Sequence, residues 1–406
     1  MLGFATEVGG KTSHTVIMAR SLEIPAVVGI PHLIADFEPG AMVILDGGAG
    51  LLIVDPEEAT LARYRLSKSA HQERERRLRA DAARPAATLD GVGILLSANV
   101  ELPQEGNLVV SCGADGVGMF RTEFLFMNRS ALPDEEEQYG VYRRMVEALG
   151  GKPVTIRTID VGGDKLVAPA SGQEPPAEAN PALGLRAIRY CFREPKVFRT
   201  QLRAILRASA HGRTRILLPM ISGLDEWRWA RKEVARCAAE LAQEGIAQDP
   251  KIQVGIMVEV PSAALLADWF AREVDFFSLG TNDLIQYSLA IDRGNEAVAY
   301  LYEPLQPAIL RLLKTVIDAA AAHGKRVNLC GEMGSEPQYL PVLLGLGLRE
   351  LSMHAVQIPR MKKWVGAIDL EEARRITAHA LTLSTGEEVR TYVSAANARI
   401  DTPTSA

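Results

Sequence analysis

Short apolar segments alternate with longer amphipathic stretches over most of this 406-residue chain. Several of the apolar segments are continuous runs, as expected for strands buried on both faces of a parallel sheet. After residue 89 there are eight of them, at residues 92–100, 116–123, 154–160, 215–220, 252–260, 275–283, 326–332 and 348–354. Stretches with helical periodicity lie between them, for example residues 225–243 and 307–323. The pattern predicts eight consecutive strand–helix units.

Eight strand–helix units over roughly 270 residues match a TIM (β/α)8 barrel, whose usual length is about 250 residues. An open, doubly wound sheet is the alternative, because it shows the same alternation of strands and helices. The α/β class follows from either arrangement. We expect the barrel, since eight units suffice to close it.

Two further regions precede the predicted barrel, which we place at residues 88–400. Residues 1–56 are rich in glycine and carry short apolar runs at 26–28 and 42–45, which predicts part of a small α/β domain. Residues 57–87 are dense in charge and poor in glycine, so they predict an exposed linker helix closed by Pro85. The expected order is a small domain, a linker helix and a barrel.

Composition narrows the class of protein. Hydrophobic residues make up 47% and charged residues 23% of the chain, as in soluble globular proteins, and the net charge of −5 argues against nucleic acid as a partner. The four cysteines form no CxxC pair, which favours reduced thiols. No run approaches the ~20 apolar residues of a membrane span, and no signal peptide is evident. We therefore expect a cytoplasmic protein without membrane insertion.

Charged and polar residues gather at the carboxyl ends of the predicted strands. In a TIM barrel these ends converge on one face, where the active site lies. The residues are Asn99, Glu101, Arg121, Glu123, Arg157, Asp160, Glu259, Asn282, Asp283, Glu332 and His354. One such residue is readily explained as the start of a loop, but seven strands with the same feature predict a shared polar site.

The residue types at this predicted site indicate the ligand. Several guanidinium groups suit phosphate and carboxylate recognition, and two carboxylates on neighbouring strands suit Mg²⁺, which takes further ligands from water and substrate phosphate. The arginines are Arg121, Arg157, Arg186 and Arg293; the carboxylates are Glu259 and Asp283; Asn282 adds an amide. The combination predicts a divalent metal with a small phosphorylated acid. Cys330 ends another strand, either as a core residue or as a proton donor.

The first region contains a different signal, GGKTSHTVIMAR at residues 9–20. Its two glycines predict a tight turn, and Thr12 or Ser13 can cap a helix that begins near His14. Backbone N–H groups at a helix start favour an anion, so a phosphate on His14 would be stabilised there. A histidine at this place is more often structural; the predicted phosphate site elsewhere in the chain favours a chemical role.

These segments resemble the phosphoenolpyruvate–protein phosphotransferases, Enzyme I of the bacterial sugar phosphotransferase system. The motif around His14 is similar to the family's phosphohistidine signature. The barrel blocks follow in the family's order: FRTEFLFM, RTIDVGGDK, NPALGLRAIR, GIMVEVPSA, FFSLGTNDLIQYSLAIDRGN and NLCGEM. Pyruvate phosphate dikinase and phosphoenolpyruvate synthase share this architecture, but they need an ATP-grasp domain for which this chain has no room.

The resemblance implies a mechanism, in which phosphoenolpyruvate phosphorylates a histidine of the swivelling first domain, pyruvate leaves, and the carrier protein HPr receives the phosphoryl group. It implies site residues in three roles: Glu259 and Asp283 for Mg²⁺; Arg121, Arg157, Arg186, Asn282 and Arg293 for the substrate; His14 and Cys330 for catalysis, with Cys330 as the candidate proton donor. It also implies a homodimer formed through the barrel, and service to sugar uptake or to a nitrogen-related paralogue.

Departures from the family keep two alternatives open. Family members carry earlier strands of the phosphohistidine domain and a helical domain that binds HPr, neither of which this chain contains. It departs also at residues 333–336 and at His354, where small residues are usual; we expect His354 to fill a strand end. One alternative is a truncated remnant that binds phosphoenolpyruvate but cannot transfer to HPr. The other is a dikinase-type fragment serving a nucleotide-binding partner chain.

Overall fold

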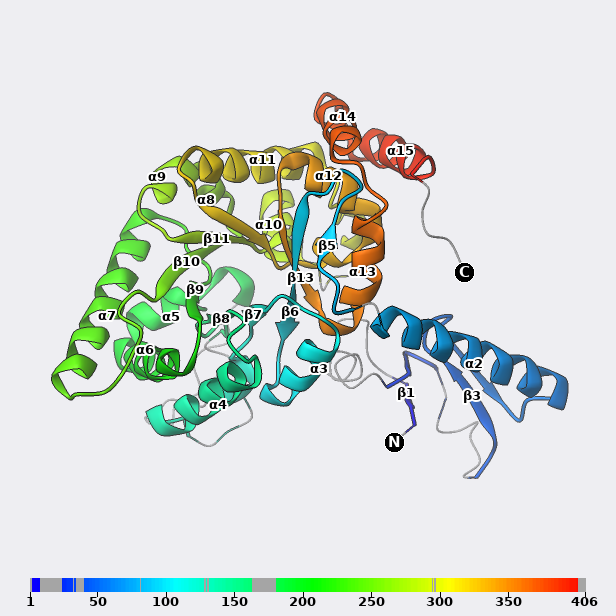
Figure 1. Ribbon diagram of the computed structural model, residues 1–406, viewed down its shortest axis with the longest axis horizontal. Helices are drawn as coiled ribbons and strands as arrows, with labels where there is room; N and C mark the ends of the chain where they lie inside the picture. Colours follow the sequence, from blue (N-terminus) through cyan, green and yellow to red (C-terminus); the bar gives the residue numbers. More distant parts are fainter. Residues whose placement is uncertain are drawn as a thin grey trace. The chain divides into compact units, whose positions relative to one another are not determined.

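The computed structural model describes residues 2–7, 24–31, 33, 40–80, 82–127, 129, 131–162, 180–293, 295 and 297–400. The chain divides into two compact units, Met1–Asp81 and Ala82–Ala406. Figure 1 labels most of the helices and strands of both units. The GGKTSHTVIMAR motif, and His14 with it, lies outside the described residues.

The described residues of the first unit form two small sheets and a long helix. Strand β1 (Phe4–Thr6) runs parallel to β2 (Ala26–Val28), and β3 (Val43–Asp46) pairs antiparallel with β4 (Leu51–Val54). The Asp46 carboxylate accepts hydrogen bonds from the N–H groups of Gly48 and Ala49 at 3.0 and 2.9 Å, which fixes the turn between β3 and β4. Helix α2 (Glu58–Ala80) follows, and it ends five residues before Pro85.

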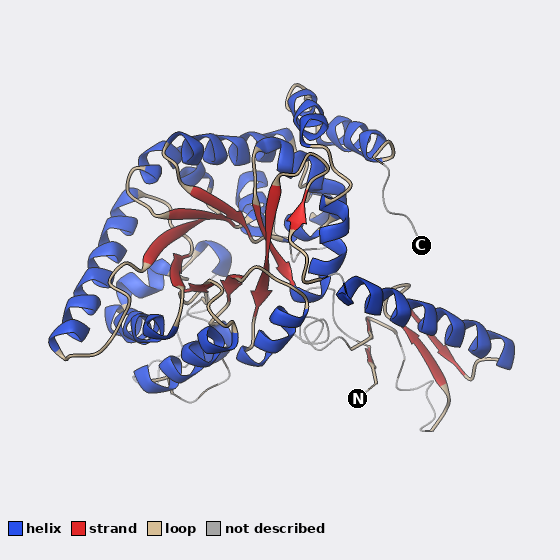
Figure 2. Ribbon diagram, in the orientation of Figure 1, coloured by secondary structure: helices blue, strands red, loops and turns tan. Residues whose placement is uncertain are grey.

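The second unit is a closed barrel of eight parallel strands with helices between them (Figures 1 and 2). The strands pair in chain order, and β13 pairs with β6, so the TIM barrel is confirmed and the open sheet is excluded. Their bounds are β6 Gly93–Val100, β7 Val117–Phe120, β8 Val154–Arg157, β9 Thr214–Leu218, β10 Gln253–Val258, β11 Phe276–Leu279, β12 Arg326–Leu329 and β13 Glu350–His354.

Alternation along each strand separates the inside of the barrel from its outer face. Ile256 and Val258 in β10 belong to the large apolar cluster shared with the helices. Met257 belongs to a small separate cluster with Met119, Leu217, Phe276 and Cys330. This small cluster forms an apolar layer inside the barrel. Glu259 continues the inward series of β10 and so reaches the carboxyl end of the barrel.

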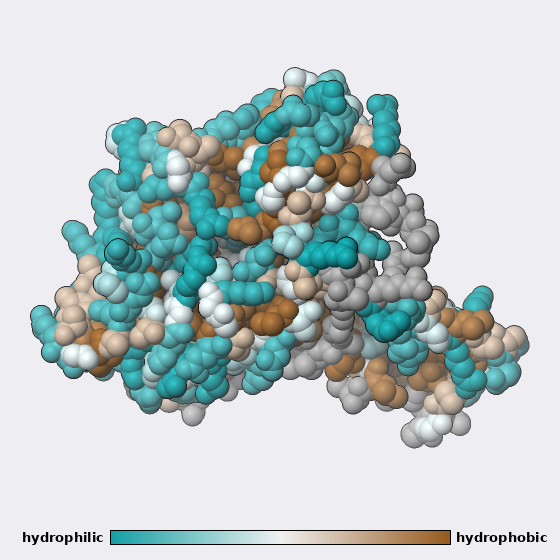
Figure 3. All heavy atoms as spheres, in the orientation of Figure 1, coloured by the Kyte–Doolittle hydropathy of each residue, from teal (hydrophilic) through white to brown (hydrophobic). Residues whose placement is uncertain are grey.

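The helices cover the strands with their apolar sides. In α6, for example, Phe198, Leu202 and Ile205 recur at helical spacing and are all fully buried. The helices are α3 Gly106–Ser111, α4 Glu135–Ala148, α5 Ile188–Arg193, α6 Pro195–Ala208, α7 Leu224–Gln243, α8 Pro261–Leu265, α9 Ala267–Ala271, α10 Thr281–Leu289, α11 Pro307–Ala322, α12 Leu340–Leu346, α13 Ile358–Val365, α14 Leu370–Ala380 and α15 Gly386–Asn397. On the face shown in Figure 3, hydrophilic side chains predominate over these outer helices.

The last residues of the predicted linker helix, 57–87, form a strand rather than a helix. Residues Ala86–Ala87 form β5, which pairs antiparallel with β6. The Lys362 ammonium donates to the carbonyls of Ala82, Arg84 and Gly113 at 2.5, 2.9 and 2.6 Å, which ties this segment to helix α13. None of the helices in the described part of the chain is both long and apolar enough to cross a membrane.

Candidate active site at the carboxyl end of the barrel

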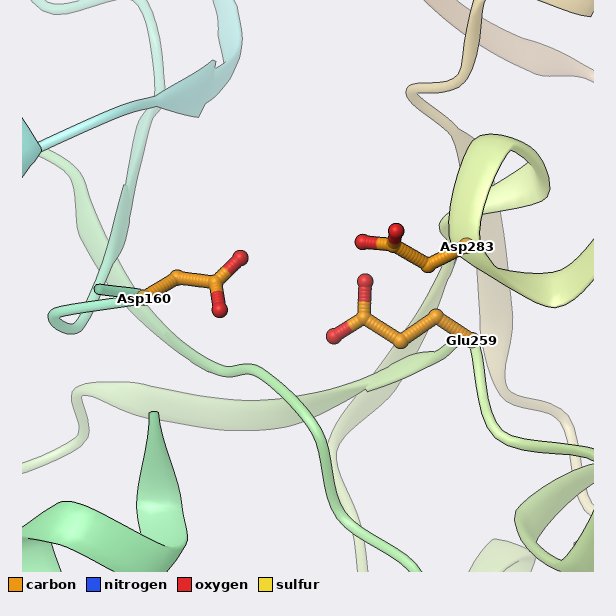
Figure 4. Close-up of side chains that lie close together, drawn as sticks. All are labelled: Asp160, Glu259 and Asp283. Carbon is orange, nitrogen blue, oxygen red and sulfur yellow. The ribbon is translucent and has the colours of Figure 1, made fainter. Parts of the chain in front are cut away.

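Three carboxylates meet at the carboxyl end of the barrel. Asp160 lies three residues beyond the end of β8, Glu259 directly follows β10, and Asp283 lies in the first turn of α10, after β11. One oxygen of each lies within 4.8 Å of the others, and Figure 4 shows the three side chains pointing toward a common centre. Carboxylates from three separate strand ends are thus brought to one point, as the fold predicts.

The buried Arg157 and the half-buried Arg186 hold one side of this cluster. Arg157, the last residue of β8, contacts Glu123 and Asp160 at 2.8 Å each, and Arg186 contacts Asp160 at 2.8 Å. Burial alone would lower the pKa of the Arg157 guanidinium, but the carboxylates of Glu123, Asp160 and Glu259 outweigh it and raise that pKa. Both guanidinium groups therefore stay charged. The two oxygens of Asp160 are occupied by ion pairs with these two groups.

Glu259 is held differently, because it has no ion-pair partner among the described residues. Its side chain is 1% exposed, and its Oε1 accepts a hydrogen bond of 2.6 Å from the N–H of Met220. Met220 has a φ of 57°, in the left-handed region that residues with a side chain seldom adopt, so the surrounding structure must fix it there. A Cβ on Gly280 would lie 2.9 Å from Oε2, so glycine leaves this oxygen room.

A divalent cation fits this arrangement. Glu259 Oε2 accepts no hydrogen bond from the described residues, and the Asp283 oxygens lie 3.5 Å from Arg186 and 4.0 Å from Arg293, too far for strong bonds. Burial, together with the Asp160 and Asp283 carboxylates, raises the pKa of Glu259 well above its ordinary value of 4.5. A cation beside Glu259 and Asp283 would supply the positive charge that this carboxylate lacks.

We expect the metal-free protein to lose stability as pH rises. The folded protein holds the Glu259 proton more tightly than the unfolded chain, because the pKa of Glu259 is raised on folding. Stability from this group is therefore complete below pH 4.5 and falls as pH rises toward the folded pKa. The measurement is the thermal midpoint in EDTA from pH 5 to 8, for the wild type relative to Glu259→Gln.

Glutamine keeps the acceptor for Met220 but cannot ionise, so Glu259→Gln should gain on the wild type as pH rises. A saturating divalent cation should remove that gain. Glu387→Gln, at an exposed position in α15, is the matched control. A difference between wild type and Glu259→Gln that stays flat across this pH range would contradict the assignment.

The remaining residues expected at the site surround this cluster. Arg121 directly follows β7 and pairs with Glu101. Asn282 accepts a hydrogen bond of 2.9 Å from the Glu332 N–H, which joins the ends of β11 and β12. Arg293 is the most exposed of the four arginines and reaches toward Asp283. His354 is the last residue of β13 and pairs in register with Asn99.

Cys330 lies at the end of β12, both in the apolar layer and beside the charged cluster. It is 4% exposed, and its thiol donates toward the Leu279 carbonyl at 3.5 Å and accepts from the Ser278 hydroxyl at 3.3 Å. Burial raises the pKa of the Cys330 thiol, and Glu259 adds to this, whereas Ser278, Arg157 and Arg121 oppose it. The thiol is therefore protonated at neutral pH.

The structure adds two positions, Asp160 and Met220, that hold the charged cluster together and that the sequence did not single out. Asp160 was visible as a polar residue after a strand, but its role as the joint partner of Arg157 and Arg186 depends on the distance between separate loops. Met220 acts through its backbone N–H, and nothing in a methionine side chain signals such a role.

Two family models match the chain. The family model for the PEP-binding domain of PEP-utilising enzymes matches residues 75–370, and the model for their mobile domain matches residues 1–50. Among solved structures, a citrate lyase from Burkholderia xenovorans LB400 superposes with a TM-score of 0.44 at 16% identity, over 79% of this chain and 94% of that chain.

Several curated relatives named phosphoenolpyruvate-protein phosphotransferase match over nearly the whole chain. The protein from Geobacillus stearothermophilus is 48% identical over 391 residues, which cover 96% of this chain and 67% of that protein. Those from Priestia megaterium and Bacillus subtilis (strain 168) are 46% and 45% identical over 391 residues, covering 96% of this chain and 68% of each relative. This chain therefore belongs to the phosphoenolpyruvate-protein phosphotransferases, a family of transferases among the PEP-utilising enzymes.

Proposed function

We propose that this protein takes the phosphoryl group of phosphoenolpyruvate onto His14, releases pyruvate and passes the phosphoryl group to HPr. The observation that carries the proposal is the pairing, at one barrel end, of three clustered carboxylates able to hold a metal ion with arginines whose positive charge carboxylates stabilise. A small acid bearing both phosphate and carboxylate needs both kinds of partner. The family to which the chain belongs supports phosphoenolpyruvate as that acid.

Mg²⁺ is the cation that we propose for Glu259 and Asp283. Both offer hard oxygen ligands, and two protein ligands suit an ion that keeps waters and takes further ligands from a phosphate. When bound, it would neutralise negative charge on the substrate phosphate. Asp160 is less suited as a ligand, because its oxygens already accept from Arg157 and Arg186.

The arginines are proposed to bind and orient the substrate. Arg157 and Arg186 are held by ion pairs with Asp160, so little side-chain entropy remains to be lost on binding. Arg121 and Arg293 are more exposed, at 32% and 41% of the side chain, and can move to grip the substrate. Asn282 adds an amide at the same rim. Together they would hold the phosphorus in line with the attacking imidazole of His14.

Cys330 is proposed to complete the reaction. When the phosphorus–oxygen bond breaks, its electrons go to the enolate of pyruvate, which needs a proton on carbon. The burial that raises the pKa of the Cys330 thiol keeps a proton available, and Arg157 and Arg121 would then stabilise the thiolate. The core interpretation of Cys330 and its chemical role are compatible, because the residue lies at the border of the apolar layer.

Cys330→Ser should slow pyruvate formation by roughly 10²-fold, because a hydroxyl donates a proton far less readily than a thiol. Phosphoenolpyruvate affinity should stay within about twofold, since serine is close to cysteine in size and leaves the charged substrate ligands unchanged. The measurement pairs steady-state pyruvate release with calorimetric titration. Cys237→Ser, at another buried cysteine, is the control. Unchanged turnover in Cys330→Ser would leave Cys330 with only a core role.

The proposal as a whole is tested by incubating the protein with labelled phosphoenolpyruvate and Mg²⁺, with and without HPr. Protein-bound label that is acid-labile and base-stable is the expected result. Label that then moves to HPr supports the complete reaction. Phosphoenolpyruvate binding without any label would replace it with the alternative of a binding or regulatory remnant.

We propose further properties of the family for this protein. They are a swivelling phosphohistidine domain at residues 1–56, a linker helix at 57–87, a barrel at 88–400, a homodimer formed through the barrel, a place in sugar uptake or nitrogen regulation, and a cytoplasmic location. The four cysteines are buried and form no disulfide among the described residues, which supports the cytoplasmic location. The helix α2, within residues 57–87, supports the linker.

A further inference from the structure

The opposite, amino-terminal end of the barrel contains a cavity of about 180 Å³. TIM-barrel interiors are usually filled by branched apolar side chains. Here the inward positions carry charge and polarity instead: Arg215 in β9, Arg326 and Asn328 in β12, and Glu350 in β13 all border the cavity, with Arg213 just before β9. This end of the barrel is therefore built as a polar site rather than as a packed core.

The charges around this cavity are not balanced. Arg326 pairs with Glu350, and the Asp115 carboxylate accepts a hydrogen bond of 2.8 Å from the Leu96 N–H. Neither Arg213 nor Arg215 has a carboxylate partner within the described ranges, and Arg215 instead lies 5.7 Å from the centre of the Phe276 ring. Burial lowers the pKa of Arg215, and Arg326 and Arg213 lower it further, against the opposing effect of Glu350. A partly buried cation without a counter-charge is costly, and an anion would relieve it.

A second, independent feature lies at the inner side of the same cavity. Asn328 is 8% exposed, and its Oδ1 has no hydrogen-bond partner among the described residues. Its Nδ2 lies 3.5 Å from the Ser278 hydroxyl, the limit for a hydrogen bond. Rotation of the amide by half a turn would present two N–H donors to the cavity. Unsatisfied buried amides are rare, and one beside a polar cavity indicates a bound water or ligand.

The size of the cavity limits the ligand. Its volume is about six times the ~30 Å³ that a water occupies in the liquid, so it can hold a small anion with some waters. It is too small for a nucleotide-sized ligand, whose sites usually exceed about 300 Å³. Because all eight strands are parallel, this cavity is at the opposite end from the carboxylate cluster.

We propose that the amino-terminal mouth of the barrel binds a small oxyanion, a phosphate or carboxylate group, through Arg215 and Arg213, with Asn328 as the inner donor. A guanidinium group can donate two parallel hydrogen bonds to two oxygens of one anion. Its planar geometry suits both phosphate and carboxylate groups. The site is separate from the one proposed for phosphoenolpyruvate, and its test does not depend on catalysis.

The test is calorimetric titration of the intact chain with inorganic phosphate and, in a second arm, with succinate. We expect Arg215→Gln to weaken binding at this site by about tenfold and Arg213→Gln by about threefold. Arg375→Gln, an exposed arginine of α14 that pairs with Glu372, should leave it unchanged. Arg213 is exposed, so its substitution keeps the test valid even if Arg215→Gln impairs folding.

Arg121→Gln distinguishes binding at the two ends of the barrel, because it changes only the site at the carboxyl end. Tighter phosphate than succinate would identify a phosphate group as the ligand, and the reverse order a carboxylate; both support an oxyanion site. Binding of neither probe to the wild type would overturn the proposal. Affinities within twofold of the wild type in both Arg215→Gln and Arg213→Gln would also overturn it. The same holds if only Arg121→Gln loses affinity for the probes.

Discussion

Replacing His14 by alanine is expected to abolish protein-bound label from phosphoenolpyruvate. Alanine removes the nitrogen that we propose as the acceptor, and the carboxyl end of the barrel has no other proposed nucleophile. Pyruvate formation should fall by roughly 10³-fold or more, because only water is left to accept the phosphoryl group. Binding of phosphoenolpyruvate should persist, since the proposed substrate ligands all belong to the barrel.

The control for this variant is His71→Ala, in the exposed middle of helix α2. It removes an imidazole from the same unit of the chain and leaves the sequence of the GGKTSHTVIMAR motif unchanged. Label should be retained in His71→Ala. Acid-labile label that survives in His14→Ala would move the phosphorylated residue to another of the seven histidines.

Glu259→Gln is expected to reduce phosphoenolpyruvate-dependent labelling by roughly 10²–10⁴-fold, the range for loss of several kcal/mol of charge stabilisation. Glutamine preserves the shape of the side chain and can still accept from the Met220 N–H, so the fold around it should survive. What it removes is the negative charge that would hold the cation. Labelling rates at increasing Mg²⁺ concentration provide the measurement.

Asp283→Asn should give the same kind of loss, because Asp283 is the second proposed ligand. Glu387→Gln should match the wild type at every Mg²⁺ concentration. Normal labelling in both Glu259→Gln and Asp283→Asn would refute the metal assignment while leaving the histidine proposal untouched. Full rescue of Glu259→Gln at high Mg²⁺ would instead indicate weakened binding of the metal alone.

The sequence predicted the barrel because its strands are apolar and evenly spaced, but it placed several strand ends too late. The segment at residues 154–160 is strand only to Arg157. Ile159, beyond that end, is still fully buried in the core, so apolar character continues into the loop. Likewise, Ala86–Ala87 form a short strand, β5, with Ala82 and Ala86 buried, where charge density upstream favoured a continuing helix.

The site was predicted in its residue types more than in its contacts. Strand ends gave Arg157, Glu259 and Asp283, since parallel strands must converge there. The sequence could not show that Asp160 holds two arginines while Glu259 holds none, because such pairing depends on distances of a few ångströms between loops. The polar cavity at the opposite end was missed for a related reason, as single arginines at strand starts resemble ordinary surface residues.

The apolar layer of Met119, Leu217, Met257, Phe276 and Cys330 makes the two halves of the barrel separately adjustable. Its side chains lie between the carboxylates at one end and the arginines at the other, and no ion pair among the described residues joins these two charged groups. One hydroxyl links the two ends, because Ser278 contacts both Cys330 and Asn328. Charged groups without shared partners contribute additively to stability. One scaffold can therefore be redesigned at either mouth, with new ligands at one end and existing chemistry preserved at the other.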